Sequence, residues 1–269
     1  MEIDGVHVEV VGDGVPTLVL HGGLGVDHSA YRSLDPLLAG LRLIYLDHRG
    51  NGRSARPDPA TLTMAGWADD ALRVGRAVAG DRPVVVIGHS YGGFVAQELA
   101  IRHPAAVRAL VLMCTTPGQL AGGEEPAPPG PPLPVEFERL LSSPPASDDE
   151  LAAGMAAMAP AYVHRADPDS LRNLMAGTVF SVSGMRRGFE VLSEWSSVDR
   201  LATITAPTLV IGGRHDPLTS WPQAYRIAAR VPDAEVVVFE HSSHFPWLDE
   251  PEQFTVTARR WLHRHGLPI

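Results

Sequence analysis

Residues 88–92, Gly-His-Ser-Tyr-Gly, contain the serine whose surroundings best suit a nucleophile. The run Pro83 to Ile87 before it is apolar and β-branched, as in a strand buried on both faces. Phe94 to His103 after it carries helix-forming residues that stop at Pro104. Ser90 is therefore expected at a tight strand-to-helix turn, where small flanking residues let the chain fold back and expose the hydroxyl. This context favours a nucleophile over a serine that only caps the helix.

An acid and a base follow two later predicted strands. Pro207 to Ile211 reads as a strand and leads into Asp216. Ala234 to Glu240 reads as another and leads to His244. Because the carboxyl ends of parallel strands meet at one edge of a sheet, both side chains are expected beside Ser90. His244 would take the serine's proton during attack, and Asp216 would orient the imidazole and stabilise its charge.

Predicted strands and helices alternate along most of the chain. Short β-branched runs indicate strands, and longer stretches with an amphipathic period indicate helices. This alternation is typical of the α/β class, with a mostly parallel sheet and helices on both faces. Strands are expected near residues 6–11, 16–20, 41–46 and 107–113, and helices near 29–38, 63–78, 223–231 and 251–265.

The alternation is interrupted between the two halves of the expected core, residues 1–116 and 201–269. Pro117 to Pro145 contain nine prolines and read as a loop or hinge. Helical patterns follow, so residues 117–200 are interpreted as a helical cap inserted into the core. The expected cap helices are one opened by a capping box at 147–150, a second over 169–182 and a third near 185–195.

The cap is expected to cover a nonpolar substrate. Four of the seven methionines of the chain lie in it, and such flexible, polarisable side chains suit a lid over an apolar ligand. The same methionines could instead fill the cap's own small core. The residues predicted to contact the substrate are Leu24, Met155, Met158, Phe180, Met185, Phe189, Trp195 and Phe245.

The composition excludes several kinds of protein. The formal charge of -9 argues against a nucleic-acid surface, and no window reaches the ~20 apolar residues of a membrane span. The chain has no lysine for Schiff-base chemistry, and its single cysteine, Cys114, is expected to be a small buried hydrophobe. Histidines and acids show no compact metal-ligand spacing. A soluble, cytoplasmic protein that acts on a small molecule without metal or cofactor is expected.

Five motifs carry a resemblance to a known family. The chain resembles the α/β-hydrolase fold family over essentially its whole length, and the order Ser, Asp, His matches that of the family. The resemblance implies an eight-stranded-type, mostly parallel sheet with a helical cap. The motifs are similar to those of the proline iminopeptidase-like branch: HGGLG, DHRGNGRS, GHSYGG, GRHDP and SSHFPWLDEPEQF.

The resemblance also implies an oxyanion hole. The backbone N–H groups of Tyr91, just after the nucleophile, and of Gly23 would stabilise the tetrahedral intermediate. It favours His244 over His241 as the base, because the segment Phe-Pro-Trp-Leu-Asp-Glu-Pro follows His244 directly.

Four other motif residues have structural interpretations. His21 is expected to order the HGG loop by hydrogen bonds, and His89 to point into the packing around its strand. Asp47 and Arg49 are interpreted as a pair that braces a turn.

The activity predicted is that of a serine hydrolase acting on a small, largely apolar ester, lactone or amide. An aminopeptidase would need cap carboxylates to hold an ammonium group, and the candidates Glu190 and Glu194 share a helix with Arg186 and Arg187. Carbon-carbon bond hydrolysis and cofactor-free peroxidation use the same triad, and a non-catalytic ligand receptor on this fold is a further alternative. Ser90 argues against dehalogenases and epoxide hydrolases, whose nucleophile is an aspartate.

Overall fold

The computed structural model describes residues 1–23, 25–118 and 131–267. In this part, eight strands form one sheet in the order β1-β2-β4-β3-β5-β6-β7-β8. The β1–β2 and β2–β4 pairs are antiparallel, and every later neighbour is parallel. The expected mostly parallel α/β sheet is thereby confirmed. Its strands are β1 (Glu2–Ile3), β2 (Val6–Val11), β3 (Val15–Leu20), β4 (Leu41–Leu46), β5 (Val84–His89), β6 (Val107–Met113), β7 (Thr208–Gly213) and β8 (Ala234–Phe239).

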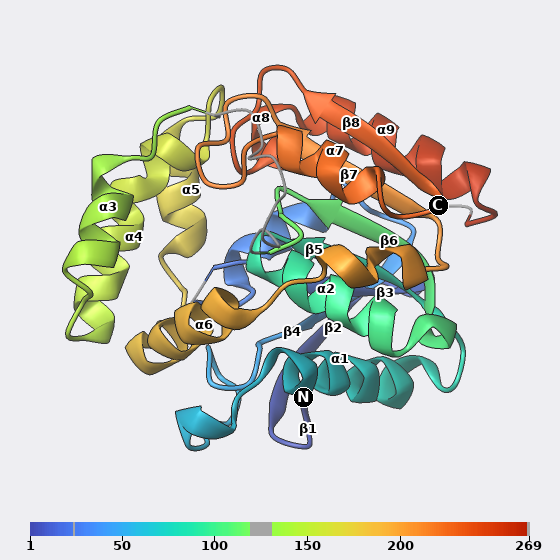
Figure 1. Ribbon diagram of the computed structural model, residues 1–269, viewed down its shortest axis with the longest axis horizontal. Coiled ribbons are helices and arrows are strands. Elements are labelled where there is room, and N and C mark those ends of the chain that lie inside the picture. The colour runs from blue at the N-terminus through green and yellow to red at the C-terminus, as the bar shows by residue number, and fades with distance from the viewer. Residues whose placement is uncertain (24, 119–130, 268–269) are drawn as a thin grey trace.

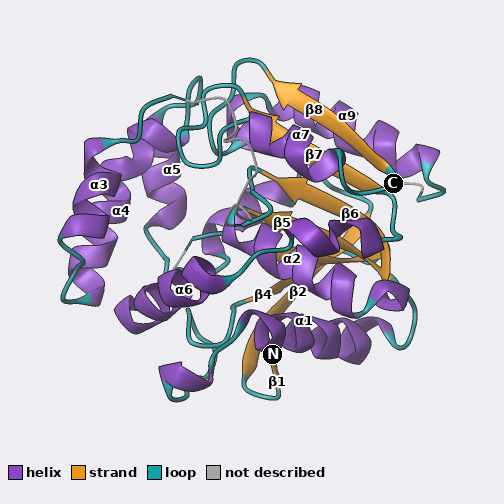
Figure 2. Cartoon of the chain, in the orientation of Figure 1, coloured by secondary structure: helices purple, strands orange, loops and turns teal. Residues whose placement is uncertain are grey.

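Helices cover both faces of the sheet (Figure 2). Val84 and Val86 of β5 pack into a core that contains α1 and α2, whereas Val85 and Ile87 pack into a second core that contains α9. Side chains of a strand alternate between faces, so four consecutive apolar residues of β5 are needed to fill both cores. The helices outside the β6–β7 connection are η1 (Ser29–Leu34), η2 (Pro59–Thr61), α1 (Met64–Ala79), α2 (Tyr91–Arg102), η3 (Pro104–Ala106), α7 (Pro222–Ala228), α8 (Pro246–Asp249) and α9 (Pro251–Arg264).

A group of helices between β6 and β7 lies beyond the carboxyl ends of the strands, on the left in Figure 1. The arrowhead of β6 points toward them. This group, called the cap helices below, consists of α3 (Val135–Ser142), α4 (Asp148–Tyr162), α5 (Pro168–Met175) and α6 (Val182–Glu194), with η4 (Val198–Thr203) leading back to the sheet. None of the helices in the described residues is long and apolar enough to cross a membrane.

Three local expectations about helices were wrong. Helix α3 lies in the stretch interpreted as a loop, because no proline interrupts the chain between Pro134 and Pro144 and two apolar side chains, Phe137 and Leu140, pack against the core. The helix expected to run to Val182 ends at Met175, just before Gly177 and two β-branched residues. The helix expected over residues 29–38 is a short 3₁₀ turn, Ser29–Leu34.

The contact between α2 and the sheet gives the first prediction. A Cβ on Gly92 would overlap the backbone carbonyl of Leu20, which no side-chain rotation can relieve. Gly92→Ala should therefore lower the free energy of unfolding by about 3 kcal/mol in urea titrations. Gly177→Ala is the matched control, since a Cβ there meets nothing within 4 Å, and its stability should stay the same or rise slightly. Equal stability of the two variants would contradict this packing.

Candidate active site

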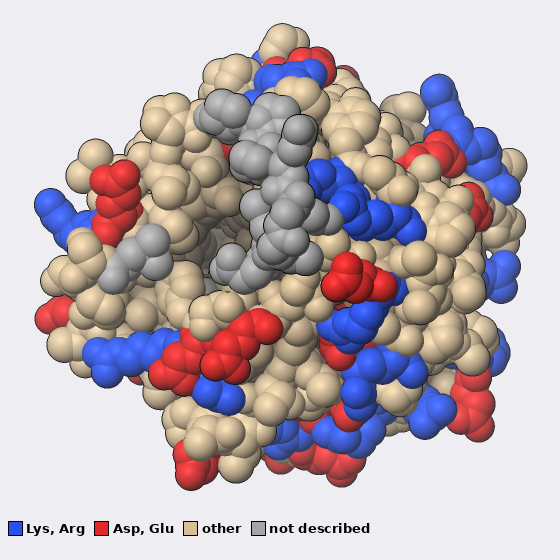
Figure 3. Space-filling view, in the orientation of Figure 1, with Lys and Arg blue, Asp and Glu red and all other residues tan. Residues whose placement is uncertain are grey.

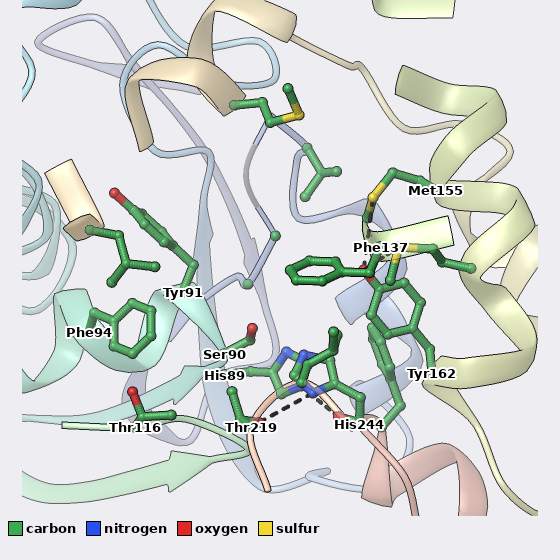
Figure 4. Close-up of a pocket in the computed structure, with 18 of the residues that line it drawn as sticks. His89, Ser90, Tyr91, Phe94, Thr116, Phe137, Met155, Tyr162, Thr219 and His244 are labelled. Carbon is green, nitrogen blue, oxygen red and sulfur yellow. Dashed lines mark hydrogen bonds between the residues drawn. The ribbon is translucent and has the colours of Figure 1, made fainter. Parts of the chain in front are cut away.

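Ser90 stands between the end of β5 and the start of α2 with φ 51° and ψ −118°. L-residues rarely adopt this positive φ, so neighbouring groups must hold it. The Ser90 N–H donates to the carbonyl of Met113 at 2.9 Å. The Ser90 carbonyl accepts from Thr115 Oγ1 and from the N–H of Gly93, both at 2.9 Å. The strained turn is thus fixed by both β6 and α2, and the hydroxyl points into a cavity (Figure 4).

Only glycine fits at two positions around this turn. A Cβ on Gly88 would lie 2.6 Å from both the Ala96 side chain and the Gly92 carbonyl oxygen. A Cβ on Gly22 would lie 2.7 Å from the Cβ of Ser90. The HGG loop therefore packs directly on the turn that carries Ser90.

His244 and Asp216 are in direct contact. His244 Nδ1 donates to Asp216 Oδ2 at 2.8 Å, which leaves Nε2 as the nitrogen that can accept a proton. The carboxylate also accepts the hydroxyl of Thr219 at 2.6 Å and the N–H groups of Leu218 and Thr219 at 2.8 and 3.1 Å. Burial alone would raise the pKa of Asp216, but the charge of His244 and these hydrogen bonds outweigh it and hold the pKa below its ordinary value. The acid is therefore ionised beside the imidazole.

The loop that carries His244 is tied to the end of α4. The N–H groups of His244 and Phe245 both donate to the carbonyl of Tyr162, at 3.0 and 3.2 Å. Asp249 Oδ2 accepts from the N–H of Ser243 at 2.8 Å. Its other oxygen accepts three consecutive N–H groups just after α4, at 2.8 Å each, from residues 164–166. The cap helices and the histidine loop thus share one hydrogen-bonded junction.

Ser90 and His244 line the same cavity, which has a volume of about 530 Å³. Figure 3 shows it as a hollow beside the cap helices whose visible wall is mostly tan, meaning neither acidic nor basic. Gly23 and Tyr91, the proposed oxyanion donors, also line it, and Gly23 has a φ of 72° that suits glycine. Five of the predicted substrate contacts do so too: Met155, Met158, Met185, Phe189 and Phe245.

Two predicted contacts lie elsewhere, and Leu24 lies outside the described residues. Trp195 is buried against Phe94 and donates its indole N–H to Glu98 at 2.9 Å, because the chain turns back to the core where α6 ends. Phe180 is not among the cavity residues; it packs, partly buried, against the core. Both predictions were wrong for the same reason, since aromatic character alone does not say which surface a cap residue faces.

Several cavity residues were not predicted. Tyr162 could have been found, because it continues the apolar period of α4 that contains Met155 and Met158. Phe137 and Leu140 lay hidden in the stretch interpreted as a loop. Other described residues that line the cavity and were not predicted include Met175, Thr178, Leu218, Thr219, Ser220, Gln223 and Arg226.

The other motif histidines and acids have structural partners. His21 orders the HGG loop as expected, with Nδ1 2.8 Å from the Gly22 carbonyl. Asp47 and Arg49 do not pair with each other, but Asp47 Oδ2 accepts the N–H of Arg53 at 2.9 Å, so Asp47 alone braces the turn. Asp47 Oδ1 lies 2.5 Å from His28 Nδ1, and Arg49 forms a double hydrogen bond with Asp70 at 2.9 and 3.0 Å.

One group of buried side chains has the spacing of a metal site among the described residues: His89, Cys114 and His244, with ligand atoms within 4.8 Å of one another. Nδ1 of His244 is bonded to Asp216, and Nε2 of His89 lies 2.7 Å from the His244 carbonyl oxygen. Burial also raises the pKa of the Cys114 thiol well above its usual range, which disfavours the thiolate that binds metals. This group therefore fits a hydrogen-bonded cluster better than a metal centre.

A family profile described as alpha/beta hydrolase fold matches residues 16–251 of this chain. Three individual proteins give further informative matches. A putative carbamate hydrolase, RutD, from Caulobacter sp. (strain K31) is 29% identical and covers 97% of this chain and 96% of its own length. Proline iminopeptidase PfmaB from Pestalotiopsis fici is 26% identical, covering 94% of this chain and 93% of its own. The solved structure of the esterase EaEST from Exiguobacterium antarcticum has a TM-score of 0.78 at 23% identity, covering 96% and 95%.

The environment of Asp216 predicts how acid affects stability. The pKa of Asp216 is lower in the folded chain than the value of about 3.9 expected when unfolded. The stability it contributes is therefore present above about pH 4 and lost as the pH falls further. The gap in unfolding free energy between wild type and Asp216→Asn should be largest near pH 6 and shrink by pH 3, as measured by urea titration. A gap that stays constant would contradict the lowered pKa.

Proposed function

Because this chain belongs to the α/β-hydrolase fold family and is a hydrolase, we propose that it cleaves a small, largely apolar ester, lactone or amide through an acyl-enzyme on Ser90. The observation that carries the proposal is the placement of a serine with a strained positive φ in the same cavity as a histidine already bonded to a buried carboxylate. The resemblance to proline iminopeptidases expected from the motifs is confirmed by a relative of that name.

In the proposed reaction, Ser90 Oγ attacks the substrate carbonyl carbon while His244 Nε2 takes its proton. The developing oxyanion accepts the N–H groups of Gly23 and Tyr91, each of which contributes about 3 to 4 kcal/mol in the transition state. His244 then gives the proton to the leaving group, and water attacks the acyl-enzyme with the same base. Asp216 keeps the proton on Nδ1 throughout and stabilises the imidazolium charge.

The wall of the cavity supports an apolar acyl group. All four methionines of the cap helices line it, together with aromatic side chains from several elements. A flexible thioether wall can pack around acyl groups of different shape. The names of the relatives, a carbamate hydrolase and an esterase, support cleavage of a bond between a carbonyl carbon and a heteroatom.

The aminopeptidase alternative lacks a suitable acid among the described cavity residues. Glu190 and Glu194 do not line the cavity, and Glu190 pairs with Arg187 at 3.0 Å. The acid that does line it is Asp27, whose carboxylate is buried and accepts the N–H groups of residues 29 and 179 at 2.8 and 3.0 Å. It also lies 3.1 Å from Arg53. A carboxylate already paired in this way is poorly suited to bind a substrate ammonium.

A fluorophosphonate probe tests the nucleophile without knowledge of the substrate. The probe should add once per chain, at Ser90, because only an activated serine attacks phosphorus at a useful rate. Ser90→Ala should abolish labelling, as read by intact-protein mass spectrometry. Ser220→Ala is the matched control, since Ser220 lines the same cavity and should be dispensable for labelling. This assignment fails if Ser90→Ala still carries the label, and an unlabelled wild type would favour a non-catalytic receptor.

The role of Asp216 gives a kinetic prediction. Asp216→Asn should lower kcat on an activated ester by about 10⁴-fold with little change in KM, because the amide stabilises the wrong imidazole tautomer. Steady-state kinetics of both proteins would check this. Near-normal turnover in the variant would mean that another acid orients His244.

A further inference from the structure

We propose that Tyr31 and His89 are positioning residues, which hold the HGG loop and the His244 loop in place on either side of Ser90. This proposal rests on the proposed function, because it concerns how the same three segments are aligned. Neither residue would take part in bond making. Their role would be carried by a continuous hydrogen-bonded chain beneath the nucleophile.

The hydrogen-bonded chain has three short links. The N–H of Gly22 donates to Tyr31 Oη at 2.6 Å. Tyr31 Oη lies 2.7 Å from His89 Nδ1, and His89 Nε2 lies 2.7 Å from the carbonyl oxygen of His244. Its ends are thus the backbone of the HGG loop and the backbone of the proposed base.

The direction of every link follows from chemistry. The carbonyl oxygen of His244 can only accept, so His89 Nε2 must carry a hydrogen. Burial lowers the pKa of His89 well below its usual value, so the ring is neutral and Nδ1 is a bare acceptor. Burial also raises the pKa of the Tyr31 hydroxyl, which therefore keeps its proton and donates it to Nδ1. The phenol oxygen in turn accepts from Gly22, and no donor faces another donor.

Tight packing holds the hydrogen-bonded chain in one arrangement. Tyr31 and His89 are 3% and 1% exposed. Trp247 packs against both rings, with centroids 5.6 and 4.9 Å away, and its indole N–H is fixed by Ser33 Oγ at 2.9 Å. Each buried polar atom of the chain would lose its partner if the segments shifted, so the network resists displacement.

The three linked segments are those that hold the proposed reacting groups. Gly22 precedes the oxyanion donor Gly23, His89 precedes Ser90, and the last acceptor belongs to His244 itself. These segments come from distant parts of the sequence, so tertiary contacts must set their spacing. A displacement of about 1 Å in such a site can cost 10²-fold in rate. Fixing the segments together should therefore affect the reaction far more than substrate binding.

Tyr31→Phe tests this by removing one oxygen atom. We expect the second-order rate of fluorophosphonate labelling at Ser90, and kcat on an activated ester, to fall about 10- to 100-fold, with KM within about three-fold of wild type. Tyr45→Phe is the matched control, because Tyr45 is equally buried and its hydroxyl donates to Asp35 at 2.6 Å and to the backbone carbonyl of Tyr31 at 3.3 Å, but to no atom of the hydrogen-bonded chain. The thermal stability of Tyr45→Phe should fall, like that of Tyr31→Phe, but the labelling rate of Tyr45→Phe should stay within about two-fold of wild type.

A second substitution tests whether Tyr31 and His89 act through one hydrogen-bonded chain or independently of each other. His89→Leu should slow labelling as Tyr31→Phe does, and the double variant should be little slower than either single variant, because one break already interrupts the chain. His89→Gln keeps a donor for the His244 carbonyl and should recover part of the loss.

Three results would overturn the proposal: an unchanged labelling rate in Tyr31→Phe, an equal loss in Tyr45→Phe, or fully multiplicative losses in the double variant. Failure of the proposed function is distinguishable, because wild type itself would then not be labelled at Ser90. Circular dichroism melting of each variant verifies that the compared proteins are folded.

Discussion

The backbone conformation of Ser90 is the constraint on which the rest of the site depends. A residue with a side chain held at φ 51° and ψ −118° costs about 1 to 3 kcal/mol relative to a relaxed conformation. That cost is met by a rigid surrounding. Strand β5 is paired on both edges by parallel strands and is buried on both faces, and α2 packs against β3 so closely that Gly92 has no room for a side chain. The turn remains strained because the sheet and the helix on either side of it are packed too tightly to move.

A second constraint is electrostatic. Asp216 is fully buried, and an ionised carboxylate without partners would be very costly there. Four hydrogen bonds from its own loop and from His244 compensate for this, and they fix the imidazole at the same time. The junction at Asp249 adds a further buried carboxylate that ties the His244 loop to the end of α4. Alignment of the proposed base is therefore coupled to the position of the cap helices.

Much of the core was predictable from sequence because its signals are local. Buried parallel strands require β-branched runs such as Pro83 to Ile87, and the turn at Ser90 requires small neighbours, so both leave a readable pattern. The cap was less predictable. Its helix α3 follows a series of prolines that indicate a loop, and Trp195 faces the core although Phe189 and Leu192 of α6 line the cavity. Where a helix packs against two surfaces, tertiary packing determines which of its residues face each surface.

The contacts of Tyr31 could not have been found in the sequence. It lies in a short 3₁₀ helix and meets His89 from 58 positions away. No motif contains both residues, and a buried tyrosine is by itself ordinary core. Asp47 and Arg49 show the same limit, since opposite charges two positions apart suggested a pair, whereas Asp47 contacts His28 and Arg49 contacts Asp70. Side-chain polarity indicates that a partner is needed, but only the fold determines which one.

The most direct measurement of the central claim is a crystal structure of the protein after inactivation with a small alkyl phosphonate, which resembles the tetrahedral intermediate. Electron density should join phosphorus to Ser90 Oγ, with the phosphoryl oxygen within hydrogen-bond distance of the N–H groups of Gly23 and Tyr91 and with His244 Nε2 facing the adduct. A phosphonate bound to another side chain, or an imidazole turned away from the adduct while still bonded to Asp216, would contradict the proposed chemistry.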